Sequence, residues 1–213
     1  MLTVPPEFSL GYALLLATPT GSALLDSASL ATAVGTINPD LGGAYGRAME
    51  GGRLELTATQ LPAPNQACLL AHELTHCLDL AFWNINAGTV SRIQLGATEI
   101  NAHYNQGLIA KELLINPQLS QAFKTQIETM MSGFTTWGRV GDTWTRDDVY
   151  RYLDSTDQYG PSVRALLATK PLYIWTMDSE WELGMKLFHC ELHLDTNTRN
   201  RLTRLNMPHD PVW

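Results

Sequence analysis

The segment LLAHELTHCLDL, residues 69–80, contains the strongest structural signal in the chain. Leucine and alanine surround three polar residues, His72, Glu73 and His76, in a pattern typical of a buried helix. His72 and His76 are four residues apart, so a helix places both imidazoles on one face, with Cβ atoms about 5–6 Å apart. Burying two histidines and a glutamate without partners would be costly. A bound metal ion accounts for all three residues.

The residue types predict one zinc ion as the cofactor. Two imidazoles at this spacing can bind one Zn²⁺ at about 2.0–2.1 Å from each nitrogen. Glu73 is adjacent to the first histidine and is not placed as a ligand, but it can reach a water in the open coordination position. Zinc lowers the pKa of such a water toward about 7, and a neighbouring carboxylate can take its proton. The pattern therefore predicts His72 and His76 as metal ligands and Glu73 as the catalytic base.

This H-E-x-x-H pattern resembles that of the zinc metallopeptidases called zincins. In metzincins a glycine follows the second histidine by three residues, and a third ligand follows three residues later. Asp79 and Phe82 occupy those positions here, which excludes that branch. Gluzincins instead take a glutamate from a second helix downstream, and Glu99, 23 residues after His76, fits that layout. The resemblance covers about residues 53–115 and implies one zinc ion held by His72, His76 and Glu99. The alternative for Glu99 is a solvated glutamate on a helix face.

Two further polar residues lie close to the motif in sequence. Asp79 follows His76 by three residues, as in the H-E-x-x-H-x-x-D pattern of several compact zinc peptidases. We expect it to orient a ligand imidazole or a neighbouring loop, the alternative being a surface acid at a helix end. His103 stands where thermolysin-like gluzincins have an aspartate, so the chain departs from that pattern. His103 is a candidate hydrogen-bond donor to a ligand, proton donor to the substrate, fourth ligand or ordinary helix residue.

Peptide hydrolysis by a zincin also needs a donor that stabilises the negatively charged oxygen of the transition state. Sequence does not rank the candidates, which are His103, Tyr104, Tyr150, Tyr173, His189 and His193. The last two form a second histidine pair at helical spacing, with no adjacent glutamate and no clear third ligand. The alternating segment 53–59 is expected to be an edge strand that binds extended peptide by strand addition.

The remaining pattern is rich in helices. Helices are expected over residues 9–16, 22–36, 66–82 with Asn65 as N-cap, about 90–115 starting near Thr89, 118–131, 146–153, 163–169, 179–192 and 196–205. Residues 38–52 are glycine-rich and predict a loop, as do residues 133–143. No domain boundary is evident, so residues 1–213 are expected to form one domain with a helical C-terminal part over about 117–213. The zincin resemblance implies an α+β fold, a helix-rich core with a small β-sheet and added C-terminal helices.

Composition excludes some classes of partner. The net charge is -7 and no run of basic residues occurs, so neither nucleic acid nor an anionic membrane surface is expected as a partner. No segment reaches the length of a membrane-spanning helix. No cation precedes the apolar run at residues 10–17, which excludes a classical secretory signal. We therefore expect a cytoplasmic protein, or one exported without such a signal. The sequence does not predict an oligomeric state.

The cysteines do not form a disulfide framework. Cys68, Cys77 and Cys190 cannot all pair within one chain, and none shows C-x-x-C spacing. Cys68 and Cys77 flank the histidine motif and are expected to be small buried apolar residues, the alternative being a thiolate ligand.

Three functions remain open at this point. The leading one is a zinc metallopeptidase, a hydrolase that acts on a peptide or protein substrate, in a housekeeping role or as a proteolytic toxin or effector. The second is a catalytically inactive binding or regulatory protein that keeps the zincin scaffold. The third is an apolar helical interaction protein in which the motif is accidental.

Overall fold

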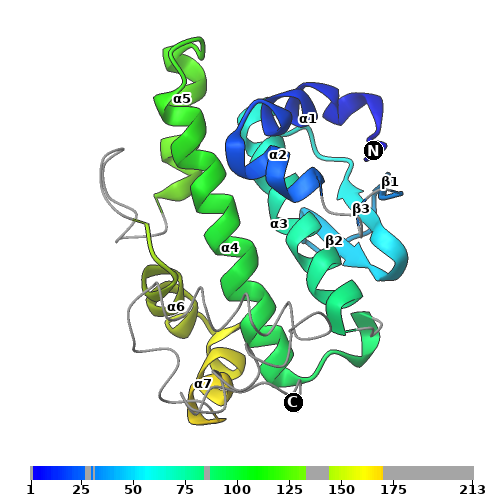
Figure 1. Ribbon diagram of the computed structural model, residues 1–213, viewed down its shortest axis with the longest axis vertical. Helices are drawn as coiled ribbons and strands as arrows, with labels where there is room; N and C mark the ends of the chain where they lie inside the picture. The colour runs from blue at the N-terminus through cyan, green and yellow to red at the C-terminus, as the bar shows by residue number, and fades with distance from the viewer. Residues whose placement is uncertain (1, 27–29, 31, 84–86, 133–143, 170–213) are drawn as a thin grey trace, which may run out of the picture.

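The computed structural model describes the chain except for residues 1, 27–29, 31, 84–86, 133–143 and 170–213. The described part consists of helices around a small sheet (Figure 1). Three short 3-10 helices lie at Pro6–Phe8, Glu50–Gly52 and Ala87–Thr89. The longer elements are α1 (Ser9–Leu16), α2 (Pro19–Leu25), β1 (Val34–Asn38), β2 (Gly46–Met49), β3 (Arg53–Thr57), α3 (Ala63–Trp83), α4 (Arg92–Ile115), α5 (Gln121–Met131), α6 (Arg146–Asp154) and α7 (Gly160–Thr169). This helix-rich architecture with one sheet is consistent with the expected α+β class.

The sheet has three strands in the order β1-β3-β2. β3 pairs in parallel with β1 and antiparallel with β2, so β3 is the central strand. The expectation that the strand in segment 53–59 is a free edge is therefore wrong, because both of its sides are already hydrogen-bonded. The edge strands are β1 and β2.

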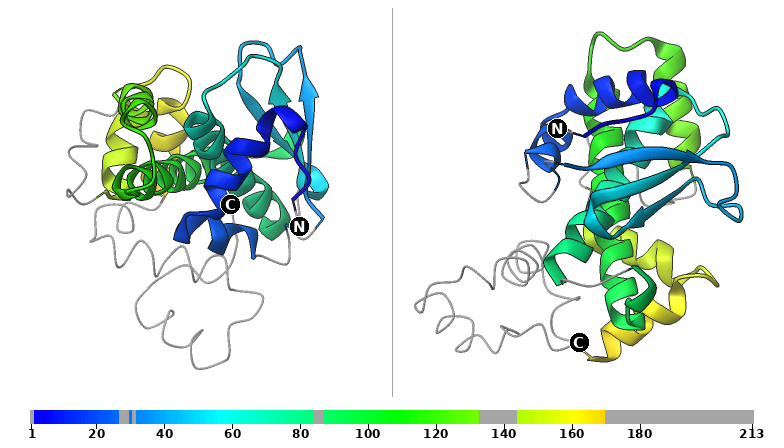
Figure 2. Two further views of the ribbon diagram at one scale, coloured as in Figure 1. Left: turned by 90° about the horizontal axis from the view of Figure 1, so that it is seen from above. Right: turned by 90° about the vertical axis from the view of Figure 1, so that its right-hand side faces the viewer.

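One part of the core lies between the sheet and α3. Leu54 and Leu56 of β3 and Leu70 and Leu74 of α3 are fully buried there. Figures 1 and 2 show α3 between the sheet on one side and α4 on the other, with α6 and α7 packed against α4. α3 is thus covered on both sides, which explains why its sequence is apolar over most of its length.

α3 and α4 form an antiparallel pair. Polar contacts run between them in opposite numerical order, since Thr75 meets Asn105 whereas Asp79 meets Asn101. α4 begins with a capping box, in which the Ser91 hydroxyl accepts from the Gln94 N–H and the Gln94 side chain accepts from the Ser91 N–H. Ser91, rather than Thr89, is therefore the N-cap of this helix.

Several other sequence-based boundaries differ from the structure. Among them, α5 begins at Gln121 rather than at residue 118, and α7 begins at Gly160 rather than at residue 163. Residues 22–36 do not form one helix, because the Thr18 hydroxyl caps an earlier helix with Pro19 in its first turn, and the β-branched segment from Val34 onward forms β1. α3 begins at Ala63 rather than after Asn65. A proline in the first helical turn loses no helical hydrogen bond, so Pro64 does not delay the helix. Residues 38–52 contain β2, which had been expected to be loop.

Among the described residues no single helix has the length and apolar composition needed to cross a membrane. The pair Pro6–Leu16 and Pro19–Leu25 meets both criteria when taken together, but it is bent by 113°.

Close packing of α4 against α7 depends on Gly96. An added Cβ at this position would lie 2.6 Å from the backbone oxygen of Ser162 and 2.8 Å from its carbonyl carbon. We expect Gly96→Ala to lower the free energy of unfolding by about 1–3 kcal/mol, because backbone atoms of α7 cannot move aside as a flexible side chain can. Urea denaturation measures this change.

Gly88→Ala is the matched control for that variant. No atom lies within 4 Å of a Cβ built at Gly88, so the control should change stability by no more than about 0.5 kcal/mol. Equal denaturation midpoints for the two variants would show that α4 and α7 do not approach as closely as described.

Candidate metal centre

Three side chains from two helices meet in one group that could hold a metal ion. His72 and His76 come from α3 and Glu99 comes from α4, and one donor atom from each lies within 4.8 Å of the others. The two histidine Nε2 atoms are 3.0 Å apart. Glu99 Oε1 is 3.7 Å from His76 Nε2, and Glu99 Oε2 is 3.8 Å from His72 Nε2. The predicted association of Glu99 with the histidine pair is thus present in the geometry.

Hydrogen bonds on the far side of each ring orient the two imidazoles. His72 Nδ1 lies 3.1 Å from Gln106 Oε1, and His76 Nδ1 lies 2.7 Å from Thr98 Oγ1. The oxygen of a carboxamide can only accept, so His72 donates its Nδ1–H and keeps the Nε2 lone pair free. The Thr98 hydroxyl can accept the Nδ1–H of His76 in the same way. Both rings therefore present the nitrogen that a metal would bind, as ligand histidines commonly do.

Burial keeps these imidazoles neutral, which is the form that coordinates metals. Burial and, to a smaller extent, the neighbouring His103 together lower the pKa of His76 to about 3. The pKa of His72 is also well below its usual range, first because of burial and then because of His103 and His76.

The Glu99 carboxyl group has an oxygen atom that makes no hydrogen bond. Its side chain is 7% exposed, and Oε2 is a buried atom without a hydrogen-bond partner among the described residues. Burial raises the pKa of this carboxyl to about 8, and the charge of Glu73 adds to the rise. Oε2 lies 3.8 Å from His72 Nε2 and 3.4 Å from His103 Nδ1, and Oε1 lies 3.7 Å from His76 Nε2. A buried carboxyl group with one oxygen that makes no hydrogen bond is a costly arrangement for the protein alone. A cation at that point would compensate it, so the donor set fits a metal ion.

Glu73 lies beside this group but under strand β2. An ideal Cβ at Gly46 of β2 would be 2.6 Å from Glu73 Oε1 and 2.8 Å from its Cδ, so a larger residue there would displace the Glu73 carboxyl group. Burial raises the pKa of Glu73 to about 8, although a hydrogen bond from the backbone of Ala48 and the charge of Arg47 oppose the rise. Gly46 lies in the glycine-rich segment predicted to be a loop. In the structure it allows the edge strand β2 to pass directly over the Glu73 carboxyl group.

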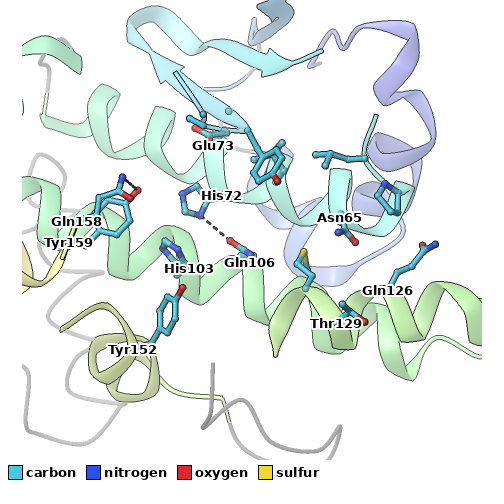
Figure 3. Close-up of a pocket in the computed structure, with 18 of the residues that line it drawn as sticks. Asn65, His72, Glu73, His103, Gln106, Gln126, Thr129, Tyr152, Gln158 and Tyr159 are labelled. Atoms are coloured by element: carbon cyan, nitrogen blue, oxygen red, sulfur yellow. Dashed lines mark hydrogen bonds between the residues drawn. The ribbon is translucent and has the colours of Figure 1, made fainter. Parts of the chain in front are cut away.

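A pocket of about 890 Å³ opens at the site. Its walls come from the segment that leads into β2, the first turns of α3, one face of α5, and the region of α6 and α7 (Figure 3). His72, Glu73 and His103 lie in its middle, with Tyr152 and Tyr159 toward one end. Of the three candidate ligands only His72 lines this pocket, so the cleft reaches the metal group at that residue.

His103 lies in this cleft and touches the candidate ligands. Its ring centroid is 4.5 Å from that of His72, and its Nδ1 lies 2.9 Å from the backbone oxygen of Glu99. Since a carbonyl oxygen only accepts, His103 donates Nδ1–H and leaves Nε2 as its second functional atom. Burial lowers the pKa of His103 to about 4. The alternative of an ordinary solvated helix residue does not fit this placement.

Tyr152 and Tyr159 are cleft residues that the sequence did not single out. Their rings lie 6.2 and 6.1 Å from that of His103. Tyr104 and Tyr150 are instead buried and are not among the described residues that line the pocket. Tyr104 packs under the Arg146 guanidinium, 4.0 Å from the ring centroid, and its carbonyl accepts from the Trp144 indole. Residues two apart on a helix point to nearly opposite sides of it, which is the signal that separates Tyr152 from Tyr150 on α6.

Asp79 is not a surface acid. It is 1% exposed and accepts a hydrogen bond of 3.4 Å from Asn101 Nδ2 on α4. It therefore contributes to the α3–α4 interface one turn beyond His76.

The two described cysteines are buried free thiols, as expected. Burial raises the pKa of both Cys68 and Cys77 to about 12. Neither belongs to the group of candidate ligands. Cys190, the pair His189 and His193, Tyr173 and the helices expected at 179–192 and 196–205 lie outside the described residues, as does the loop expected at 133–143.

No protein-family model, curated protein or solved structure matches this chain.

Proposed function

We propose that this protein is a zinc-dependent metallopeptidase of the gluzincin type. The observation that carries the proposal is the position of Glu99, which reaches the two histidines of the H-E-x-x-H motif from a second helix. Two imidazoles and one carboxylate are the ligand set of catalytic zinc sites that leave a position open for water or substrate. His72, His76 and Glu99 would hold the ion, and the orphaned Glu99 oxygen supports that assignment.

When bound, zinc polarises the substrate carbonyl and makes an attacking water more acidic. Glu73 is the base that takes the proton of that water, because its carboxyl group lies in the pocket beside the candidate ligands. The same carboxyl then delivers the proton to the leaving amine. His103 and Tyr159 face the cleft and are the candidates to donate hydrogen bonds to the carbonyl oxygen as it becomes negative.

Strand β2 supports a role in holding extended peptide. β2 is an edge strand, and the residues that lead into it line the pocket beside Glu73. A substrate backbone can pair with such an edge by strand addition. The sequence suggests peptide binding by strand addition for the segment that forms β3. Because β3 is central, we assign this role to β2 instead.

The test is zinc reconstitution of the purified full chain. Chelator-treated protein is dialysed against Zn²⁺, its metal content is measured by plasma mass spectrometry, and it is incubated with a diverse peptide library whose products are sequenced. We expect about one zinc per chain, a higher melting temperature with zinc, and hydrolysis only after reconstitution. Stoichiometric zinc without any cleavage would instead favour a non-enzymatic zinc-binding protein. No bound zinc and an unchanged melting temperature would favour the accidental motif.

A further inference from the structure

The pocket extends well beyond the catalytic groups. Asn65, Leu69 and His72 lie on one stripe of α3, at spacings of four and three residues, and all three line the pocket. Figure 3 shows Asn65, Gln126 and Thr129 gathered at the end of the pocket opposite Tyr152 and Tyr159. Two helices build this end, α3 through Asn65 and α5 through the other two. We call Asn65, Gln126 and Thr129 the amide end.

The amide end holds two unused hydrogen-bond acceptors. Asn65 Oδ1 and Gln126 Oε1 are both buried atoms that have no hydrogen-bond partner among the residues the structure describes. An acceptor left unpaired in a buried position is costly, because it has lost its hydrogen bonds to water. A ligand that donates hydrogen bonds there would remove that cost.

The pocket also lacks charge away from the metal centre. Glu73 is the only Asp, Glu, Lys or Arg among the described residues that line it, and the catalytic role proposed above occupies Glu73. A carboxylate at the amide end would face two acceptor oxygens and no cation. An ammonium or guanidinium would give up water without meeting a counter-charge.

We propose that the amide end is a specificity subsite for an uncharged, hydrogen-bond-donating side chain, foremost the carboxamide of Gln or Asn. The proposal rests on the peptidase function and names the substrate class of the same site. A carboxamide offers two N–H donors, one for Asn65 Oδ1 and one for Gln126 Oε1. The Thr129 hydroxyl donates to the Thr125 backbone oxygen and can only accept from a ligand.

The position of this side chain relative to the cleaved bond follows from the helix. Asn65 precedes His72 by seven residues, which is about 10 Å along α3. An extended peptide advances about 3.3 Å per residue. The subsite is therefore expected to bind the side chain of a substrate residue about three positions from the cleaved bond, on one side of that bond.

The experiment is cleavage of a proteome-derived peptide library by the zinc-loaded full chain, with products aligned on the cleaved bond. We expect Gln and Asn to exceed Glu and Lys by at least about tenfold at one position two to four residues away. No enrichment at any of these positions, or a preference for Lys or Glu in the wild type, would overturn the proposal.

A matched pair of variants connects the preference to Gln126. Gln126→Glu places a carboxylate in the subsite, and we expect the preference to shift toward Lys and Arg by about tenfold. Gln121→Glu makes the same chemical change at an exposed position of the same helix, outside the pocket, and should leave the profile unchanged. An unaltered profile in Gln126→Glu would place the selectivity elsewhere.

Failure of the peptidase function and failure of the subsite are distinguishable. The same library is passed over immobilised, zinc-loaded Glu73→Gln protein, and retained peptides are identified by mass spectrometry. Retention of Gln- and Asn-containing peptides without cleavage by the wild type would overturn the hydrolase and support the subsite. Cleavage by the wild type without any side-chain preference would support the hydrolase and overturn the subsite.

Discussion

Glu73→Gln is expected to leave zinc binding intact and to reduce peptide hydrolysis by a factor of about 10²–10⁴. The carboxamide has the shape of the carboxyl group but cannot take a proton. Glu73 is not one of the candidate ligands, so the metal group of His72, His76 and Glu99 stays complete. The measurement combines zinc content with kcat/KM on a peptide that the wild type cleaves.

Glu128→Gln is the matched control. Glu128 is exposed on α5 and does not line the pocket, so the control should match the wild type in zinc content and in kcat/KM. Undiminished hydrolysis by Glu73→Gln would mean that another group serves as the base. Loss of zinc in the same variant would mean that Glu73 is itself a ligand.

Glu99→Leu is expected to abolish stoichiometric zinc binding and yet to stabilise the metal-free protein. In the absence of metal, Glu99 is a buried carboxyl with one unpaired oxygen. Replacing such a group by an apolar side chain of similar size can raise stability by about 1–4 kcal/mol. Thermal and urea denaturation in the presence of a chelator measure the gain, and plasma mass spectrometry measures the metal.

The stabilisation should depend on pH in a defined direction. Burial raises the pKa of Glu99 from 4.5 to about 8, so between these values the folded metal-free protein binds more protons than the unfolded chain. Ionisation of Glu99 therefore lowers the stability of the metal-free wild type as the pH rises from 4.5 to about 8. The lowered pKa values of His72, His76 and His103 act in the opposite direction below 6.5, so the net fall is expected between 6.5 and about 8. Glu99→Leu should show a shallower fall. It should retain some slope, because burial also raises the pKa of Glu73 to about 8.

The control for that variant is Glu128→Leu on the exposed face of α5. It should bind zinc normally and change stability by no more than about 0.5 kcal/mol. A Glu99→Leu protein that still binds one zinc with unchanged affinity would remove Glu99 from the ligand set.

The candidate centre was largely predictable because its signals are local. The spacing of His72 and His76 needs only one helix, and Glu99 needs only a second helix that folds back beside the first. Both conditions follow from helical periodicity and from the break between the two helices, since connected helices commonly pack as antiparallel neighbours.

The sheet was harder to predict because strand order is not a local property. The segment beginning at Val34 was expected to continue a helix, and it becomes the strand that covers the far side of β3. That pairing turns β3 from an edge into the centre and makes β2 the edge beside Glu73. The glycine at position 46 is explained only by the carboxylate that lies beneath it in space.

The residues that line the pocket could not be predicted from the sequence, because they come from segments that meet only in the folded protein. Gln126 and Tyr159 lie on or beside helices that reach the site only through tertiary packing, and neither belongs to a motif. Helical periodicity places Tyr152 and the buried Tyr150 on different faces of α6. It does not predict which of these faces meets the cleft.

The antiparallel pair of α3 and α4 has a consequence for how the protein folds. All three candidate ligands, and the Gln106 and Thr98 side chains that orient the rings, lie between residues 72 and 106. Contacts between segments so near in sequence cost little entropy of loop closure, so they can form early in folding. The sheet is also local, because its β1–β3 and β2–β3 partners are no farther apart in sequence than the residues that meet across this helical hairpin. We therefore expect the hairpin to bring the metal group together without waiting for the sheet. Zinc added during refolding should accelerate assembly of the hairpin and leave the pairing of the strands unchanged.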